Sequence, residues 1–198
     1  MTAFPQITPG ASPTSFRWSL AAYHAAIAAG ILTENDRVEL INGEIIQRMA
    51  IGQRHADCVN IINLFFILSF GKAFVYSVQN PVAIDDHSEP EPDYAIIDRS
   101  SYADRPGKPR PADVRLLVEV SDGTLDYDRS TKMALYATAG ISEYWIINLQ
   151  ADQVEVHTAP DAATGTYRKV MRYDRTEQLD SPFCGQVAVA DVLPEAVA

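Results

Sequence analysis

Residues 115–149, RLLVEVSDGTLDYDRSTKMALYATAGISEYWIINL, decide the fold. The stretch contains LLVEV, a nearly continuous apolar run that is typical of a buried strand, and ends with EYWIINL, a second such run. Between them Asp128 stands where it can cap a helix that carries Met133 and Tyr136, and Gly140 can end that helix. Strand, helix and strand in this order predict a β-α-β crossover and therefore an α/β fold.

On the N-terminal side of this unit, alternating and helical spacings predict three further elements. Asn42-Gly43 between two alternating runs is a strong hairpin signal, and an alanine-rich run followed by glycine favours a short helix. The expected elements are a helix at residues 19–29, an antiparallel hairpin of residues 38–41 and 44–48, and the main core helix from His55 to Phe70.

Short strands dominate the rest of the chain, and together they predict a mixed sheet. We expect strands at FVYSVQ (74–79), PVAI (81–84) and DYAII (93–97), a loop at residues 99–111, and a C-terminal hairpin of QVEVHT and TYRKVMRY. The first 15 residues contain proline and serine in no periodic pattern, so we expect a flexible arm at 1–15 and a single domain at 16–198.

Composition excludes several classes of protein. The chain has 198 residues, 47% of them hydrophobic, which is typical of a globular domain and excludes a disordered or fibrous one. Two cysteines, Cys58 and Cys184, cannot build a disulfide framework, so we expect a cytoplasmic protein. The longest apolar run, of about ten residues, is too short to span a bilayer, so no membrane partner is expected.

A formal net charge of -10 argues against a dedicated high-affinity nucleic-acid binder, because such binding depends on neutralising phosphates. Any polyanion must therefore meet a local basic patch. Acids gather without Lys or Arg at residues 84–98, and basic loops follow at 99–115 and 168–175. An acidic centre between basic loops suits a metal ion acting on an anion, although scattered charge on solvated loops is the simpler interpretation.

Two acids stand where strands end. Glu119 interrupts an apolar strand, and Asp93 follows Pro92 and leads directly into the next predicted strand. Buried carboxylates are costly unless they are paired or bind a metal, and the two together could supply oxygen ligands to Mg²⁺. Taken singly, each also fits an ordinary role, a strand-end glutamate that reaches water or an aspartate in a turn.

Lys132 lies in the first turns of the helix that follows Glu119. A helix that begins just past a strand directs its early side chains back toward the strand end, so this ammonium could offset charge on a phosphate held by a metal. A surface lysine is the alternative. Tyr136, Tyr144 and Trp145 are expected in the core.

VELINGEI, PEPDYAIID and residues 116–149, in this order and spacing, closely resemble the Uma-type restriction endonuclease family of the PD-(D/E)xK nuclease superfamily. The resemblance covers residues 18–192. It implies a restriction-endonuclease-like fold, with a mixed central sheet flanked by helices, here with additional N-terminal and C-terminal β-hairpins. It also implies Mg²⁺- or Mn²⁺-dependent hydrolysis of phosphodiester bonds in nucleic acid, with DNA as the expected substrate.

Carried over residue by residue, the resemblance implies a set of site residues. The metal ligands fall on Asp93, Glu119 and the backbone carbonyl of Val120, and a helix-borne Lys132 replaces the superfamily's usual strand lysine, whose position is Ser121 here. Two further residues match family positions: Glu44, an upstream acid that would contact the metal through water, and His55, which would meet the scissile phosphate or fix a helix end.

The leading hypothesis is therefore a metal-dependent endonuclease that leaves 5′-phosphate and 3′-hydroxyl ends. The rival is a catalytically silent module that binds DNA or a protein partner, which the net charge and Ser121 favour. Walker loops, dinucleotide-binding glycine motifs and zinc-protease motifs are absent from the sequence. A homodimer would provide one active site for each strand of a duplex.

Overall fold

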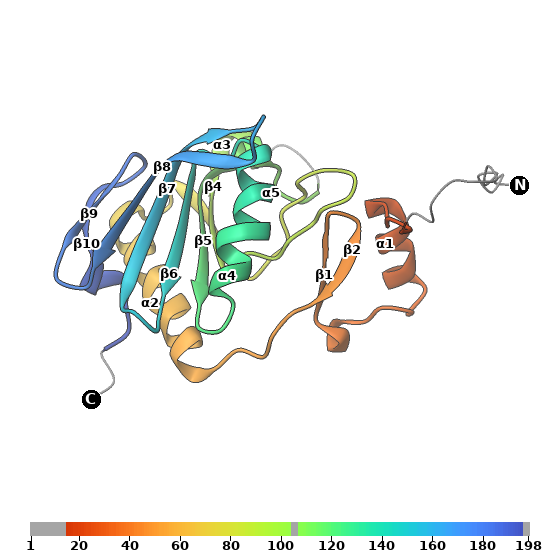
Figure 1. The fold of residues 1–198 in the computed structure, drawn as a ribbon, viewed down its shortest axis with the longest axis horizontal. Helices are drawn as coiled ribbons and strands as arrows, with labels where there is room; N and C mark the ends of the chain where they lie inside the picture. The colour runs from red at the N-terminus through yellow and green to blue at the C-terminus, as the bar shows by residue number, and fades with distance from the viewer. Residues whose placement is uncertain (1–14, 104–106, 196–198) are drawn as a thin grey trace, which may run out of the picture.

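The computed structural model describes residues 15–103 and 107–195, and it contains a six-stranded mixed sheet with helices on both faces (Figure 1). The strand order is β3-β4-β5-β6-β7-β8, and the β5–β6 pair is parallel while the other pairs are antiparallel. The strands are β3 (Phe74–Val78), β4 (Tyr94–Asp98), β5 (Val114–Ser121), β6 (Glu143–Asn148), β7 (Gln153–Asp161) and β8 (Thr166–Asp174).

The predicted crossover is confirmed, since β5 and β6 are parallel and a helical segment joins them. This segment comprises α4 (Leu125–Tyr127), a π-helical turn η3 (Asp128–Lys132) and α5 (Met133–Thr138). The prediction that Asp128 caps the helix is wrong. The helix begins at Leu125 after Thr124, and Asp128 lies buried one turn later, where its carboxylate accepts hydrogen bonds from the hydroxyls of Ser121 and Thr124.

The N-terminal elements match their predictions. Asn42 and Gly43 have φ of +52° and +78°, the left-handed pair that a tight two-residue hairpin turn requires. The remaining elements are α1 (Leu20–Ala28), η1 (Glu34–Asp36), β1 (Val38–Ile41), β2 (Glu44–Gln47), α2 (Gln53–Phe70), α3 (Arg99–Tyr102), η2 (Pro111–Asp113), β9 (Gln178–Ser181), β10 (Gly185–Ala188) and η4 (Val189–Val192).

The strands differ from the prediction in two regions. Residues 81–84 form no strand, because prolines at positions 81, 90 and 92 remove donors from any ladder, and Val82 and Ile84 instead donate to the carbonyls of Pro90 and Ser88. The β9–β10 hairpin was not predicted.

The predicted arm lies outside the described residues except for Ser15. Within the described part of the chain, no helix is long and apolar enough to cross a membrane.

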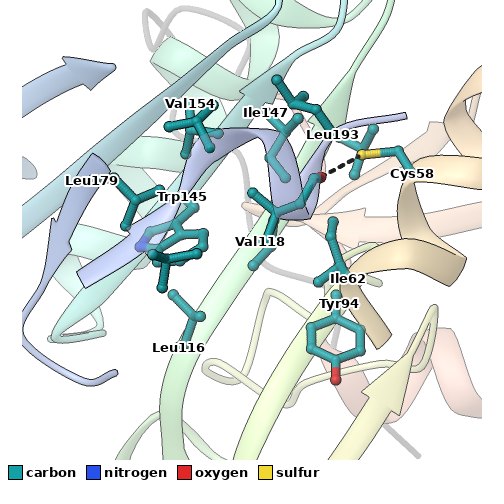
Figure 2. Packing of buried hydrophobic residues seen from close by; sticks show 14 of the residues in the cluster. Cys58, Ile62, Tyr94, Leu116, Val118, Trp145, Ile147, Val154, Leu179 and Leu193 are labelled. Atoms are coloured by element: carbon teal, nitrogen blue, oxygen red, sulfur yellow. Dashed lines mark hydrogen bonds between the residues drawn. The ribbon is translucent and has the colours of Figure 1, made fainter. Parts of the chain in front are cut away.

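A buried apolar cluster lies on each face of the sheet. Figure 2 shows the cluster beneath α2, where Ile62, Trp145 and Val118 pack together and the Cys58 thiol donates to the Val192 carbonyl at 3.5 Å. The second cluster packs α5 against the other face through Tyr136, Tyr144 and Ile146, which confirms the predicted burial of the two tyrosines. The junction of β4 and β5 is therefore held from both sides.

Candidate active site

Asp93 and Glu119 face each other across two antiparallel strands. Tyr94 pairs with Val118, so the next residue outward on each strand, Asp93 and Glu119, presents its side chain on the same face. Both are buried, with 8% and 5% of their surface exposed. The Asp93 carboxylate accepts the Val120 N–H at 2.9 Å, and the Asp93 N–H lies 3.4 Å from Glu119 Oε2. The two predicted acids form one site.

The carboxylate of Glu119 is held by two donors from the crossover helix. Lys132 Nζ lies 3.2 Å from Glu119 Oε1, and the Tyr136 hydroxyl donates to the same oxygen at 2.7 Å. Burial raises the pKa of Glu119 to about 8, because the opposing effect of Lys132 is partly cancelled by the neighbouring carboxylates of Asp93, Asp128 and Glu39. Glu119 thus lies in a region short of positive charge.

Lys132 lies at the end of the π-helical turn η3. Asp128 and Lys132, four residues apart in this turn, are both buried, each 4% exposed. Lys132 Nζ also bonds Glu39 Oε2 at 2.8 Å. Burial disfavours the ammonium, but Glu119 and Glu39 outweigh it, and the pKa of Lys132 is raised. The lysine is therefore a charged donor at neutral pH.

His55 lies in the first turn of α2 and contacts Asp93, one of the two acids. Its Nε2 is 3.0 Å from Asp93 Oδ2, and its Nδ1 is buried with no hydrogen-bond partner among the described residues. The helix therefore fixes Asp93 from the face opposite the crossover helix. Whether His55 meets the scissile phosphate stays a prediction.

Glu44 is not brought to this cluster. It is exposed on the β1–β2 hairpin, paired with Ile41, and is not among the residues that line the site cavity. Glu39, two positions before Ile41, is buried there instead and also accepts the Glu91 N–H at 2.9 Å. Sequence reasoning missed Glu39, although an acid inside the apolar run VELI carries the same signal that singled out Glu119.

The cluster forms the floor of a cavity of about 900 Å³. Its walls are the segment that joins β2 to α2, and the loop and helix start that follow β5. The lining residues include Asp93, Glu119, Val120, His55 and Lys132 of the predicted set. Five of the six predicted site residues thus share one cavity.

The donor set fits a hard divalent cation. Two carboxylates converge beside Val120, and continuing the β4–β5 register places Pro92 opposite Val120, so this strand offers the Val120 carbonyl no N–H at that position. Across the described residues, no three histidine, cysteine or acidic side chains are arranged to hold a metal. Two carboxylates and a carbonyl remain, a set that Mg²⁺ completes with water.

Residues 20–190 match the model of the Uma2 family, described as "Putative restriction endonuclease". This match spans most of the chain. The chain belongs to the Uma2 family. Membership places it among restriction-endonuclease-like nucleases, for which a nucleic-acid substrate and divalent metal ions are the general rule. The residues of VELINGEI, PEPDYAIID and the crossover unit that suggested the family all lie within the matched region.

A solved structure has the same fold as this Uma2 protein. It is a crystal structure from Anabaena variabilis ATCC 29413, described as "a putative nuclease belonging to DUF820". The two chains are 18% identical and superpose with a TM-score of 0.62, over 88% of this chain and 96% of the other. The likeness confirms the predicted mixed sheet flanked by helices. No curated protein matches the sequence.

Proposed function

We propose that this protein is a Mg²⁺- or Mn²⁺-dependent endonuclease that hydrolyses phosphodiester bonds of DNA. The observation that carries the proposal is the Asp93–Glu119 pair with the buried ammonium of Lys132 beside it, on the fold of a nuclease family. Acid, acid and lysine at one strand end are the groups that metal-assisted phosphodiester hydrolysis needs.

Asp93, Glu119 and the Val120 carbonyl would hold the metal ion. When bound, the ion would supply Lewis acidity to the phosphate and lower the pKa of water. Lys132 would stabilise the negative charge that develops on the phosphate oxygens. Because its pKa is raised, it would orient the attacking water as a donor rather than remove a proton from it. His55 would keep Asp93 in position from α2.

The absence of lysine at position 121 fits this assignment. Ser121 donates its hydroxyl to Asp128, so this position supports the helix that bears Lys132. The lysine thus approaches Glu119 from the helix instead of the strand. A water contact of Glu44 to the metal finds no support in its exposed position, and Glu39 is the better candidate for the upstream acid.

The second candidate is a nuclease-fold module that binds DNA or a protein without cutting. It is favoured by the net charge of -10 and by the two ion pairs that engage Lys132. A silent module has no need for metal at Asp93 and Glu119, so metal binding at these acids separates the two candidates. Cytoplasmic location and a homodimer remain predictions, the latter testable by light scattering.

The direct test is incubation of the purified protein with supercoiled plasmid and a single-stranded oligonucleotide, in Mg²⁺, Mn²⁺ or EDTA. The Glu119→Gln variant is the test variant and Glu155→Gln, a change in another buried strand glutamate, is its control. We expect metal-dependent cleavage by the wild type and the control, with 5′-phosphate products, and none by Glu119→Gln. Cleavage by Glu119→Gln at the wild-type rate would remove the proposed site.

A further inference from the structure

The acids of the site are recessed at the floor of the cavity. Asp93 and Glu119 are almost fully buried, so a phosphate must enter the cavity to reach them. Duplex DNA is stiff over about 150 base pairs, and its phosphates lie on the outside of a wide rod. A cavity of about 900 Å³ is of the size that takes a compact ligand, and a paired strand enters it only after local separation.

The two walls of the cavity approach each other closely. A side-chain carbon added at Gly123 would lie 3.7 Å from Met49 Cε, and one added at Gly52 would lie 3.9 Å from the Asp122 carboxylate. The segment before α2 and the loop after β5 therefore nearly touch. An opening bounded in this way admits a flexible strand more easily than a double helix.

The walls present apolar side chains to solvent. Met49 and Ile51 are 63% and 37% exposed on one side, and the partly buried Leu125 and Tyr127 line the other. Unpaired bases offer flat faces when they leave the stack, and exposed apolar side chains on the walls can pack against these faces. Base pairs in a duplex keep those faces covered.

The charge of the lining also disfavours a duplex. Among the described lining residues, seven are acidic and two are strongly basic: Glu39, Glu91, Asp93, Glu119, Asp122, Asp126 and Asp128 against Arg48 and Lys132. Both cations are already in ion pairs, Arg48 with Glu91 and Lys132 with Glu39 and Glu119. Duplex binding draws on many neutralised phosphates, whereas a short unpaired segment brings few.

We propose that the cavity takes an unpaired nucleic-acid strand, whose bases contact Met49 and Ile51. This inference rests on the proposed nuclease function and names its substrate class. Single strands, overhangs and flaps are then the substrates, and intact duplex is not.

The test compares initial rates on a single-stranded oligodeoxynucleotide, the matching blunt duplex, and the duplex with a single-stranded overhang, in Mn²⁺. We expect the first and third to be cleaved at least about tenfold faster than the blunt duplex. Faster or equal cleavage of the blunt duplex would overturn the unpaired-strand inference and leave the proposed nuclease function standing.

Matched variants test where the unpaired nucleic-acid strand binds. Met49→Ala is compared with Met171→Ala, a change at an exposed methionine of β8 that does not line the cavity. By fluorescence anisotropy, we expect Met49→Ala to weaken binding of the labelled single strand about fivefold, because an apolar contact with a base is lost, and Met171→Ala to leave it unchanged. Equal binding by Met49→Ala and Met171→Ala would contradict the inference.

Binding also separates the two proposals if no substrate is cut. A folded protein that cleaves nothing contradicts the nuclease function. Tighter binding of the single strand than of the duplex, reduced in Met49→Ala, would still support the cavity as its site, and tighter binding of the duplex would overturn it.

Discussion

Glu119 and Glu155 occupy one row of the central sheet, yet their surroundings are opposite. Glu119 pairs with Ile146 on β6, and Ile146 pairs with Glu155 on β7. Both side chains are buried. Burial alone would raise the pKa of Glu155, but hydrogen bonds from His157, Arg129 and Arg172 lower it to about 2. The pKa of Glu119 is raised to about 8.

One cation of each cluster comes from the same helical turn. Arg129 bonds Glu155 and Lys132 bonds Glu119, three residues later on the helix. Glu155 has two arginines to itself, whereas Lys132 is shared by two glutamates with Asp93 and Asp128 nearby. In the Glu155 cluster the arginines balance the charge of the carboxylate, so we interpret this cluster as structural. The Glu119 cluster is short of positive charge, a condition that a metal ion would relieve.

The largest effect is expected from Lys132→Met, which removes the one ammonium of the Glu119 cluster. The charge that stabilises the reacting phosphate is lost, so cleavage of a single-stranded oligonucleotide should fall about 100-fold or more. Glu39 and Glu119 also lose their partner, so the variant should be destabilised by about 3 kcal/mol, and Mn²⁺ should restore part of this loss.

Circular dichroism with and without Mn²⁺ checks that the lysine variant is folded. A folded Lys132→Met protein that cleaves within twofold of the wild type would mean that the lysine only balances Glu39 and has no catalytic part.

Glu155→Gln breaks the Glu155 cluster and should have the reverse outcome, with stability lost and cleavage kept. Removing the buried negative charge between Arg129 and Arg172 should cost roughly 2–3 kcal/mol, below the value for a fully buried pair because Arg172 is half in solvent. Urea unfolding measures the change. If instead the loss were in cleavage and not in stability, the two clusters would have been assigned the wrong way round.

The lowered pKa of Glu155 predicts a pH dependence of stability. Its ionised form stabilises the folded state fully above the unfolded pKa of about 4.5, and this contribution is lost as pH falls toward 2. The difference in unfolding free energy between wild type and Glu155→Gln should therefore shrink to about half between pH 6 and pH 3. A difference independent of pH would show that Glu155 is not held as a carboxylate.

The smallest effect is expected from Tyr136→Phe, which removes one neutral donor from Glu119 and leaves Lys132 in place. A net hydrogen bond of this kind is worth about 1 kcal/mol, so cleavage should fall less than tenfold. Steady-state rates measure it. A loss as large as that of Lys132→Met would mean that the hydroxyl, and not the ammonium, controls Glu119.

The sequence predicted most of what depends on local patterns. The crossover, the hairpin at Asn42-Gly43 and the core helix follow from periodicity and turn chemistry, which act over a few residues. The strand expected at residues 81–84 is absent because the prolines at positions 81, 90 and 92 supply no N–H groups for a ladder. Asp128 does not cap the helix because the helix begins three residues earlier, at Leu125.

The candidate site was predictable in part for the same reason. Lys132 meets Glu119 because both belong to the crossover unit, and Asp93 meets Glu119 through the antiparallel pairing of neighbouring strands β4 and β5. Glu39 comes from a hairpin that is held near the site by its contacts with the 87–91 loop, where Glu89 N–H donates to the Leu40 carbonyl. A long-range contact of this kind is set by tertiary packing, and residue patterns do not contain it.

The central claim is that the cluster around Glu119 needs a divalent cation and the cluster around Glu155 does not. Isothermal titration calorimetry with Mn²⁺ on wild type, Asp93→Asn and Glu155→Gln tests it most directly. We predict one site in the wild type and in Glu155→Gln, and affinity at least about tenfold weaker in Asp93→Asn. Equal affinity in wild type and Asp93→Asn, or no binding by the folded wild type, would contradict the claim.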